Sequence, residues 1–103
     1  MVEYEQEQAE IARIRIPKQG EVLGLAVQML GAGRIRVECA DGLTRICRIP
    51  GKMKKRVWIR LGDLVMIAPW KVQSEERADI IWRYTSTQTN WLRKKGYVKN
   101  VNF

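Results

Sequence analysis

Short apolar or alternating segments, separated by turn residues, follow one another through the middle of the chain. Residues 21–30 are mostly apolar, and residues 34–39 alternate polar and apolar side chains, which is typical of a half-buried strand. Residues 64–68 form a further apolar run that stops at Pro69, and residues 78–84 form the last one. Together with the second strand of a hairpin, these segments predict five short strands.

The dipeptide Asp41-Gly42 is the strongest hairpin signal in the chain. A two-residue turn at this point sets a register in which the paired residues are Val37 with Ile46, Cys39 with Thr44 and, on the outer face, Glu38 with Arg45. In that register Cys47 opposes Arg36 and points away from Cys39, so the two thiols cannot form a disulfide. Reduced thiols agree with a cytosolic protein.

Five short strands with closely spaced turns predict a small closed or nearly closed barrel. The strand count and length match the five-stranded oligonucleotide-binding barrel, the OB-fold, while an SH3-like barrel and an open sandwich are the alternatives. After the strands, Thr85-x-x-Gln88 forms a capping box that predicts a short helix ending at Gly96. The fold class is therefore all-β with a short C-terminal helix. Its predicted parts are a flexible acidic tail at 1–12, an OB-fold barrel at 13–84, and a helix and tail packed on the barrel at 85–103.

Three tryptophans help to place the core. Trp82 shares one apolar face of its strand with Ile80 and Tyr84, so we expect it inside the barrel. Trp91 lies in the predicted helix and is expected to hold that helix on the barrel. Trp70 stands at a strand end, and the sequence favours neither a core nor a surface position for it.

Composition adds a strong imbalance of charge. Among 103 residues, 19 are Lys or Arg and 11 are Asp or Glu, which gives a net charge of +8. Residues 45–60 alone contain seven basic side chains and no acidic one, and a second basic cluster spans residues 93–99. Uncompensated positive charges repel one another and favour a polyanion, which releases its own counterions on binding. Because the basic run has no amphipathic helical face, nucleic acid is favoured over a membrane surface.

Several chemistries are excluded by missing residues. The chain has no histidine and only two cysteines, so it cannot assemble a four-ligand zinc site or a histidine-dependent catalytic set. Gly51-Lys52 lacks the first glycine of a phosphate-binding loop, and Gly31-Ala32-Gly33 lacks the third glycine of a dinucleotide fingerprint. We therefore expect a protein that is not an enzyme and needs no metal or cofactor. No apolar run is long enough for a membrane helix, and the N-terminus lacks signal-peptide features, so a cytoplasmic location is expected.

One segment combines an indole with basic neighbours. Trp58 and Arg60 share one face of this segment, and Val57 and Ile59 share the other. Because an arginine is not expected to point into the core, Trp58 is expected to face outward, where it forms a base-stacking platform beside phosphate-binding groups. The alternative is that Trp58 packs beneath the basic loop as part of the core.

Several segments, taken together and in order, resemble archaeal translation initiation factor 1A. These segments are Ala40-Asp41-Gly42, Arg45 to Pro50, Gly51 to Arg60, Pro69-Trp70 and Ala78 to Tyr84. The resemblance implies an OB-fold protein that binds the small ribosomal subunit at the decoding (A) site and contacts ribosomal RNA. It further implies that the protein promotes subunit dissociation and stabilises initiator methionyl-tRNA, an indirect partner. Other initiation factors are candidate partners, and we expect a monomer in isolation.

The predicted RNA contacts combine two sets of residues. The resemblance places the RNA-contacting loop of the family on Lys52, Lys54, Lys55, Arg56, Trp58 and Arg60. The charge pattern adds four basic residues of the hairpin to the predicted RNA contacts. They are Arg34, Arg36, Arg45 and Arg48. One alternative function is a general single-stranded RNA-binding protein, an RNA chaperone of the cold-shock type, although the chain has no stripe of aromatics. Another is a protein-interaction module whose basic face meets an acidic partner.

Overall fold

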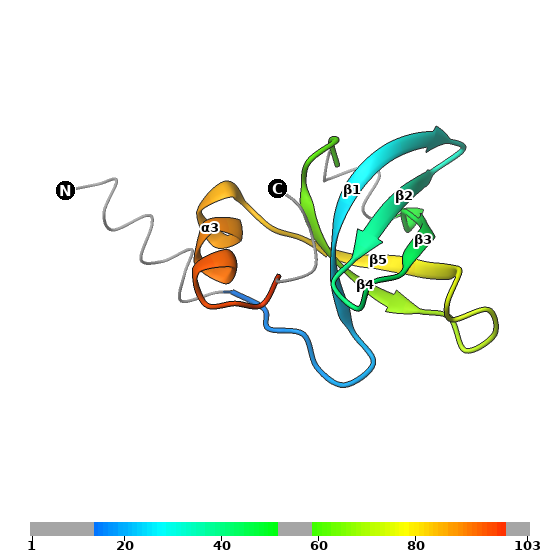
Figure 1. Ribbon diagram of the computed structural model, residues 1–103. Coiled ribbons are helices and arrows are strands. Elements are labelled where there is room, and N and C mark those ends of the chain that lie inside the picture. The colour runs from blue at the N-terminus through cyan, green and yellow to red at the C-terminus, as the bar shows by residue number, and fades with distance from the viewer. Residues whose placement is uncertain (1–13, 52–58, 99–103) are drawn as a thin grey trace.

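A computed structural model describes residues 14–51 and 59–98 of the chain (Figure 1). Its elements are β1 (Val22–Gly31), β2 (Arg34–Cys39), β3 (Thr44–Arg48), β4 (Leu64–Pro69), β5 (Arg77–Arg83) and α3 (Ser86–Lys94). The strands close a barrel in the order β1-β2-β3-β5-β4, in which β3 and β5 are parallel and the other pairs antiparallel. The prediction of a five-stranded barrel followed by a short helix is confirmed. The predicted tail at 1–12 lies outside the described residues.

Two apolar clusters hold these elements together. One fills the barrel and includes Ile35, Val37 and Ile80, all of which are fully buried. The other joins the barrel to the helix, because Leu92 of α3 packs with residues of β1 and β4. Trp91 packs against this second cluster, as expected, and Figure 1 shows α3 to one side of the barrel.

The helix begins where the sequence predicts. The Thr85 side chain accepts a hydrogen bond from the Gln88 N–H, and the Gln88 side chain accepts one from the Thr85 N–H, which completes a capping box. The helix ends at Lys94, and Lys95 caps it. Gly96 follows with a φ of 82°, a left-handed conformation that glycine adopts without strain.

The register of the β2–β3 hairpin differs by one residue from the predicted one. Val37 pairs with Arg45, and Ile35 pairs with Cys47. The reason is the turn: the Cys39 N–H donates to the Leu43 carbonyl, so the loop has three residues rather than two. Gly42 takes the left-handed position of this loop, with a φ of 89°. Since side chains alternate along a strand, the shift turns every β3 side chain to the opposite face.

Both cysteines therefore point into the barrel, and the prediction that Cys47 faces away from Cys39 is wrong. Cys39 is 2% exposed and Cys47 is fully buried, and both are free thiols. Burial raises the pKa of the Cys47 thiol to about 12 and also raises that of Cys39, despite the opposing charge of Arg45. The thiols are thus protonated, weakly nucleophilic groups of the core.

Trp82 lies on the outside, and the prediction that it belongs to the core is wrong. Met66 pairs with Trp82, but the next residue of β4 pairs with Ile80, which leaves Ile81 as an extra residue in β5. This β-bulge interrupts the alternation of side chains, so Ile80 and Trp82 no longer share a face. Trp82 is 38% exposed, and the Arg15 guanidinium lies 5.8 Å from the centre of its ring.

Candidate nucleic-acid interface

Three of the predicted RNA contacts lie on the outer face of β2 and β3. Arg34 and Arg48 form a directly opposed pair, and Arg36 follows two residues along β2. All three are exposed, because the residues that alternate with them, such as Ile35, fill the barrel. Arg36 Nη1 donates to Gln28 Oε1 at 2.6 Å, whereas no carboxylate among the described residues pairs with Arg34. The barrel therefore presents a row of positive charge on this side.

Arg60 is exposed at the start of the turn that leads into β4. The preceding residue, Ile59, is 7% exposed and packs in the barrel cluster, so the alternation predicted for this segment holds at these two positions. The Arg60 N–H donates to Asp63 Oδ2 at 2.8 Å, which fixes the turn and leaves the guanidinium outside. The remaining predicted contacts of the loop lie outside the described residues and are Lys52, Lys54, Lys55, Arg56 and Trp58.

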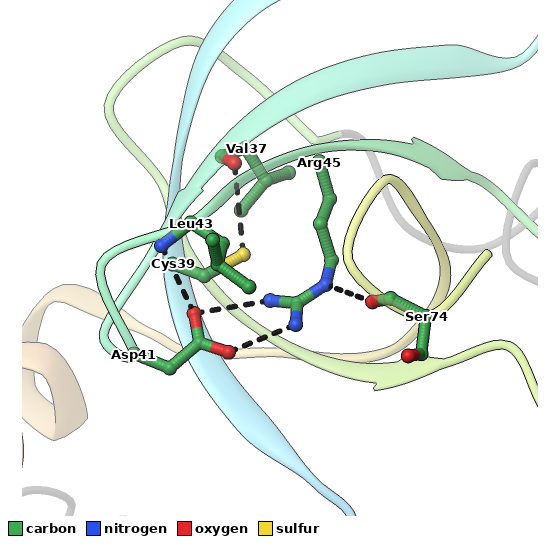
Figure 2. Close-up of polar contacts among 6 residues, drawn as sticks. All are labelled: Val37, Cys39, Asp41, Leu43, Arg45 and Ser74. Carbon is green, nitrogen blue, oxygen red and sulfur yellow. Dashed lines mark hydrogen bonds and ion pairs between the residues drawn. The ribbon is translucent and has the colours of Figure 1, made fainter.

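Arg45 is the exception among the predicted contacts, because it is buried. Figure 2 shows its guanidinium between the carboxylate of Asp41 and the backbone of Ser74. Nη1 and Nη2 donate to the two oxygens of Asp41 at 3.1 and 2.8 Å, and Nε donates to the Ser74 carbonyl at 2.6 Å. The prediction that Arg45 shares an outer face with Arg34 and Arg36 is wrong, because the three-residue turn directs it inward.

The buried arginine connects two loops at one end of the barrel. Asp41 belongs to the β2–β3 turn, where its carboxylate also accepts a hydrogen bond from the Leu43 N–H at 3.2 Å. Ser74 belongs to the β4–β5 loop, 29 positions further along the chain than Arg45. Partial burial raises the pKa of the Asp41 carboxyl, but the hydrogen bonds from Arg45 and Leu43 outweigh it and bring the pKa below its usual value. The ion pair thus positions loops and offers no charge to a ligand.

Trp70, whose position the sequence left open, lies at the surface in a cluster with Arg48 and Asp79. Trp70 is 37% exposed, and its Nε1–H donates to Asp79 Oδ1 at 3.0 Å. The Arg48 guanidinium lies 5.7 Å from the centre of the ring and donates to both oxygens of Asp79 at 3.1 Å. An exposed indole, a guanidinium and a carboxylate are therefore held together on the same side as Arg34.

A shallow groove of about 200 Å³ lies between α3 and the ends of β4 and β5. Its lining is mostly polar and consists of Gly62, Asp63, Leu64, Arg83, Tyr84, Ser86, Thr89, Asn90 and Arg93. Arg83 Nε donates to Asp63 Oδ2 at 2.9 Å, so the carboxylate that fixes the Arg60 turn also neutralises this arginine. Hydroxyl and amide groups of this kind can bind ribose or base edges.

Neither a metal centre nor a membrane segment emerges from residues 14–51 and 59–98. They contain no group of three or more Cys, Asp or Glu side chains placed to hold an ion, and none of their helices is long and apolar enough to cross a membrane.

A family model described as "Translation initiation factor 1A / IF-1" matches residues 5–102. The chain belongs to this family. It is similar to translation initiation factor 1A of Methanothermobacter thermautotrophicus, with 58% identity over 90 residues that cover 87% of this chain and 91% of that protein. The same factor of Archaeoglobus fulgidus is 53% identical over 92 residues, which cover 87% of this chain and 94% of that protein. Membership of the translation initiation factor 1A family supports a role in translation initiation.

Solved structures agree with the assigned fold. Translation initiation factor 1 from the Wolbachia endosymbiont of Brugia malayi matches with a TM-score of 0.51 and 28% identity, over 65% of this chain and 79% of that one. YjeQ from Thermotoga maritima matches with a TM-score of 0.53 over 63% of this chain. This chain spans only 23% of YjeQ and is 21% identical to it, so that likeness shows the fold alone. The prediction of an OB-fold barrel is confirmed.

Within this initiation factor 1A chain, sequence reasoning missed the contribution of Trp70 and Asp79 to the exposed surface. A signal was available for Asp79, since it alternates with Ala78 and Ile80, both of which point inward. No comparable signal existed for Trp70, because it follows Pro69 outside the alternating pattern.

Proposed function

We propose that this chain is a translation initiation factor that binds the small ribosomal subunit at its decoding (A) site and contacts ribosomal RNA there. By occupying that site it promotes dissociation of the subunits and stabilises binding of initiator methionyl-tRNA, which it contacts only indirectly. It acts in the cytoplasm by occupancy, with no catalytic step and no cofactor, and other initiation factors are its candidate neighbours.

The observation that carries this proposal is the opposed pair of Arg34 and Arg48 on an exposed face of the barrel. The Arg48 side chain is 61% exposed although Asp79 pairs with it, and no carboxylate among the described residues pairs with Arg34, so this face keeps an uncompensated positive charge that a phosphate can bind. Arg36 extends the same face, and Arg48 leads in sequence directly into the basic loop at 52–58. Arg45 is left out of the proposed contact set because its charge is buried and paired with Asp41.

Co-sedimentation with purified small ribosomal subunits tests the proposal. The full chain is titrated against subunits over a series of salt concentrations, with an unstructured single-stranded RNA as competitor. We expect saturable one-to-one binding that weakens steeply with salt, because phosphate contacts release counterions. That binding should survive an excess of competitor.

Two variants locate the contacts, and a third is their control. Arg60→Ala and Trp58→Ala each remove one proposed contact and should weaken binding to the subunit. Lys18→Ala removes the same charge as Arg60→Ala from an exposed residue outside the contact set, and should bind nearly as well as the wild-type chain. Normal affinity of both contact variants contradicts the assignment of this surface.

The competitor also separates the alternative functions. If any added RNA displaces the chain from the subunit, the protein is a general RNA chaperone. Binding that depends little on salt and ignores added RNA indicates a protein-interaction module with an acidic partner.

A further inference from the structure

We propose that Arg48, Trp70 and Asp79 form a preassembled stacking platform for one unpaired base of RNA, with Arg34 beside it to hold a phosphate. The inference rests on the proposed function, because the RNA is that of the small ribosomal subunit, and it adds a specific contact to that function. Arg48 is the last residue of β3, Trp70 directly follows β4 and Asp79 lies in β5, so the closed barrel brings the three together.

The carboxylate of Asp79 is the centre of the arrangement. It accepts hydrogen bonds from Arg48 Nε and Nη2, both at 3.1 Å, and from Trp70 Nε1 at 3.0 Å. The two bonds from Arg48 form a planar fork that sets the orientation of the guanidinium. The Trp70 ring, 5.7 Å away, then supports that guanidinium on one side. Asp79 therefore fixes the positions of both groups at once.

This arrangement differs from that of an ordinary surface arginine, whose long side chain samples many rotamers. The Arg48 side chain is 61% exposed and yet is held by two hydrogen bonds and a ring. A ligand that stacks on the exposed part of the guanidinium does not have to order it, because the free protein has already done so. Exposed and ordered at the same time, the group is suited to binding a flat partner.

The charges nearby identify this partner as RNA. Guanidinium planes and aromatic rings are the surfaces on which unpaired bases stack in RNA complexes. Arg34 faces Arg48 across the strands, and no carboxylate among the described residues pairs with it, so it is placed to bind the phosphate that accompanies a base. Arg48 also belongs to the contact set proposed for the subunit, and in the sequence it is followed closely by the basic residues at 52–58.

Two substitutions test the platform without changing the charge of the protein. Trp70→Leu removes the ring, and Arg48→Lys removes the planar fork. Each is expected to lower the affinity for small ribosomal subunits about tenfold, the effect of losing one stacked base, with an unchanged dependence on salt. Urea unfolding of each variant establishes that the barrel is intact.

Trp82→Leu is the matched control. Trp82 is exposed to nearly the same extent as Trp70, at 38% against 37%, and it also has an arginine over its ring. No carboxylate in the described part of the chain bonds to both the Trp82 indole and the Arg15 guanidinium, so Trp82→Leu is expected to change the affinity less than twofold. Equal losses for the two tryptophan variants contradict the proposal.

Ultraviolet crosslinking of the wild-type chain to the subunit, followed by mass spectrometry, does not depend on any variant folding. We expect a nucleotide adduct on the tryptic peptide Leu61–Lys71, which contains Trp70. A Trp70 crosslink to a ribosomal protein instead of RNA overturns the platform and indicates a protein contact. Wild-type affinity of Trp70→Leu and Arg48→Lys also overturns it, but leaves the proposed function standing. Absence of subunit binding by the wild-type chain overturns both.

Discussion

Removal of Asp41 is expected to destabilise the protein more than removal of Arg45, although the two side chains form one ion pair. The difference follows from their exposure, since the Arg45 side chain is 5% exposed and that of Asp41 is 35% exposed. Without Asp41, the guanidinium stays buried and keeps its bond to the Ser74 carbonyl, but it loses the one carboxylate that pairs with it among the described residues. Without Arg45, the carboxylate of Asp41 can be hydrated where it stands.

The size of each effect can be worked from this geometry. Removal of one partner of a fully buried pair costs about 3–5 kcal/mol, and partial access of water to this pair reduces that to about 2 kcal/mol for Asp41→Ala. Arg45→Met fills the same space with an apolar chain of similar length, and such replacements of buried pairs are often neutral. We expect a cost of about 1 kcal/mol or less for it, because the Ser74 carbonyl can bond to water.

Urea unfolding at pH 7, followed by tryptophan fluorescence and circular dichroism, measures these free energies. A loss of about 2 kcal/mol corresponds to a melting temperature lower by roughly 10 °C in a domain of this size. The double variant, Asp41→Ala with Arg45→Met, is expected to be more stable than Asp41→Ala alone, because it no longer buries an unpaired charge. A larger loss for Arg45→Met than for Asp41→Ala refutes this reasoning.

The same pair predicts how stability depends on pH. The folded-state pKa of Asp41 lies below its ordinary value of 3.8, so the ionised carboxylate stabilises the fold above that pH. This contribution is lost as the pH falls below 3.8 and through the folded-state pKa. In Arg45→Met the pKa returns toward its ordinary value, and the loss of stability in acid should be smaller than in the wild-type chain.

Three further substitutions or treatments have defined outcomes. Gly24→Ala places a methyl group 2.4 Å from Val37 Cγ1 and should cost about 1–3 kcal/mol in urea unfolding. Gly51→Ala should cost little, because no atom of the described residues lies within 4 Å of the added methyl group. Thr85→Ala removes the helix cap and should lower stability by about 1 kcal/mol in thermal unfolding; no change shows that the cap is redundant. The pKa of Cys47, about 12 in the fold against 9.0 ordinarily, predicts stability that is full below pH 9 and falls as the pH rises above it. A Cys47→Ala variant should lack this part of the alkaline loss, and alkylation of the native thiol should be slow until urea is added.

Local sequence determined the number of strands, their approximate bounds, the helix cap and the charge of the surface. Residues 34–39 alternate polar and apolar side chains, and β2 spans Arg34–Cys39. Thr85 and Gln88 contain both halves of the capping box within four residues, so no distant contact is needed to form it. These features depend on neighbours along the chain, and a pattern in the sequence is sufficient to predict them.

Tertiary structure decided the faces on which individual side chains lie. The dipeptide Asp41-Gly42 is compatible with a two-residue or a three-residue loop, and the two choices point Arg45 in opposite directions. The inward direction is stabilised by a hydrogen bond to the Ser74 carbonyl of the β4–β5 loop. No pattern near Arg45 in the sequence indicates that this distant loop will contact it. In the same way, the bulge at Ile81 moves Trp82 out of the core. Strand side chains repeat with a period of two, so a single extra residue inverts a face, and only contacts from distant segments select between the two results.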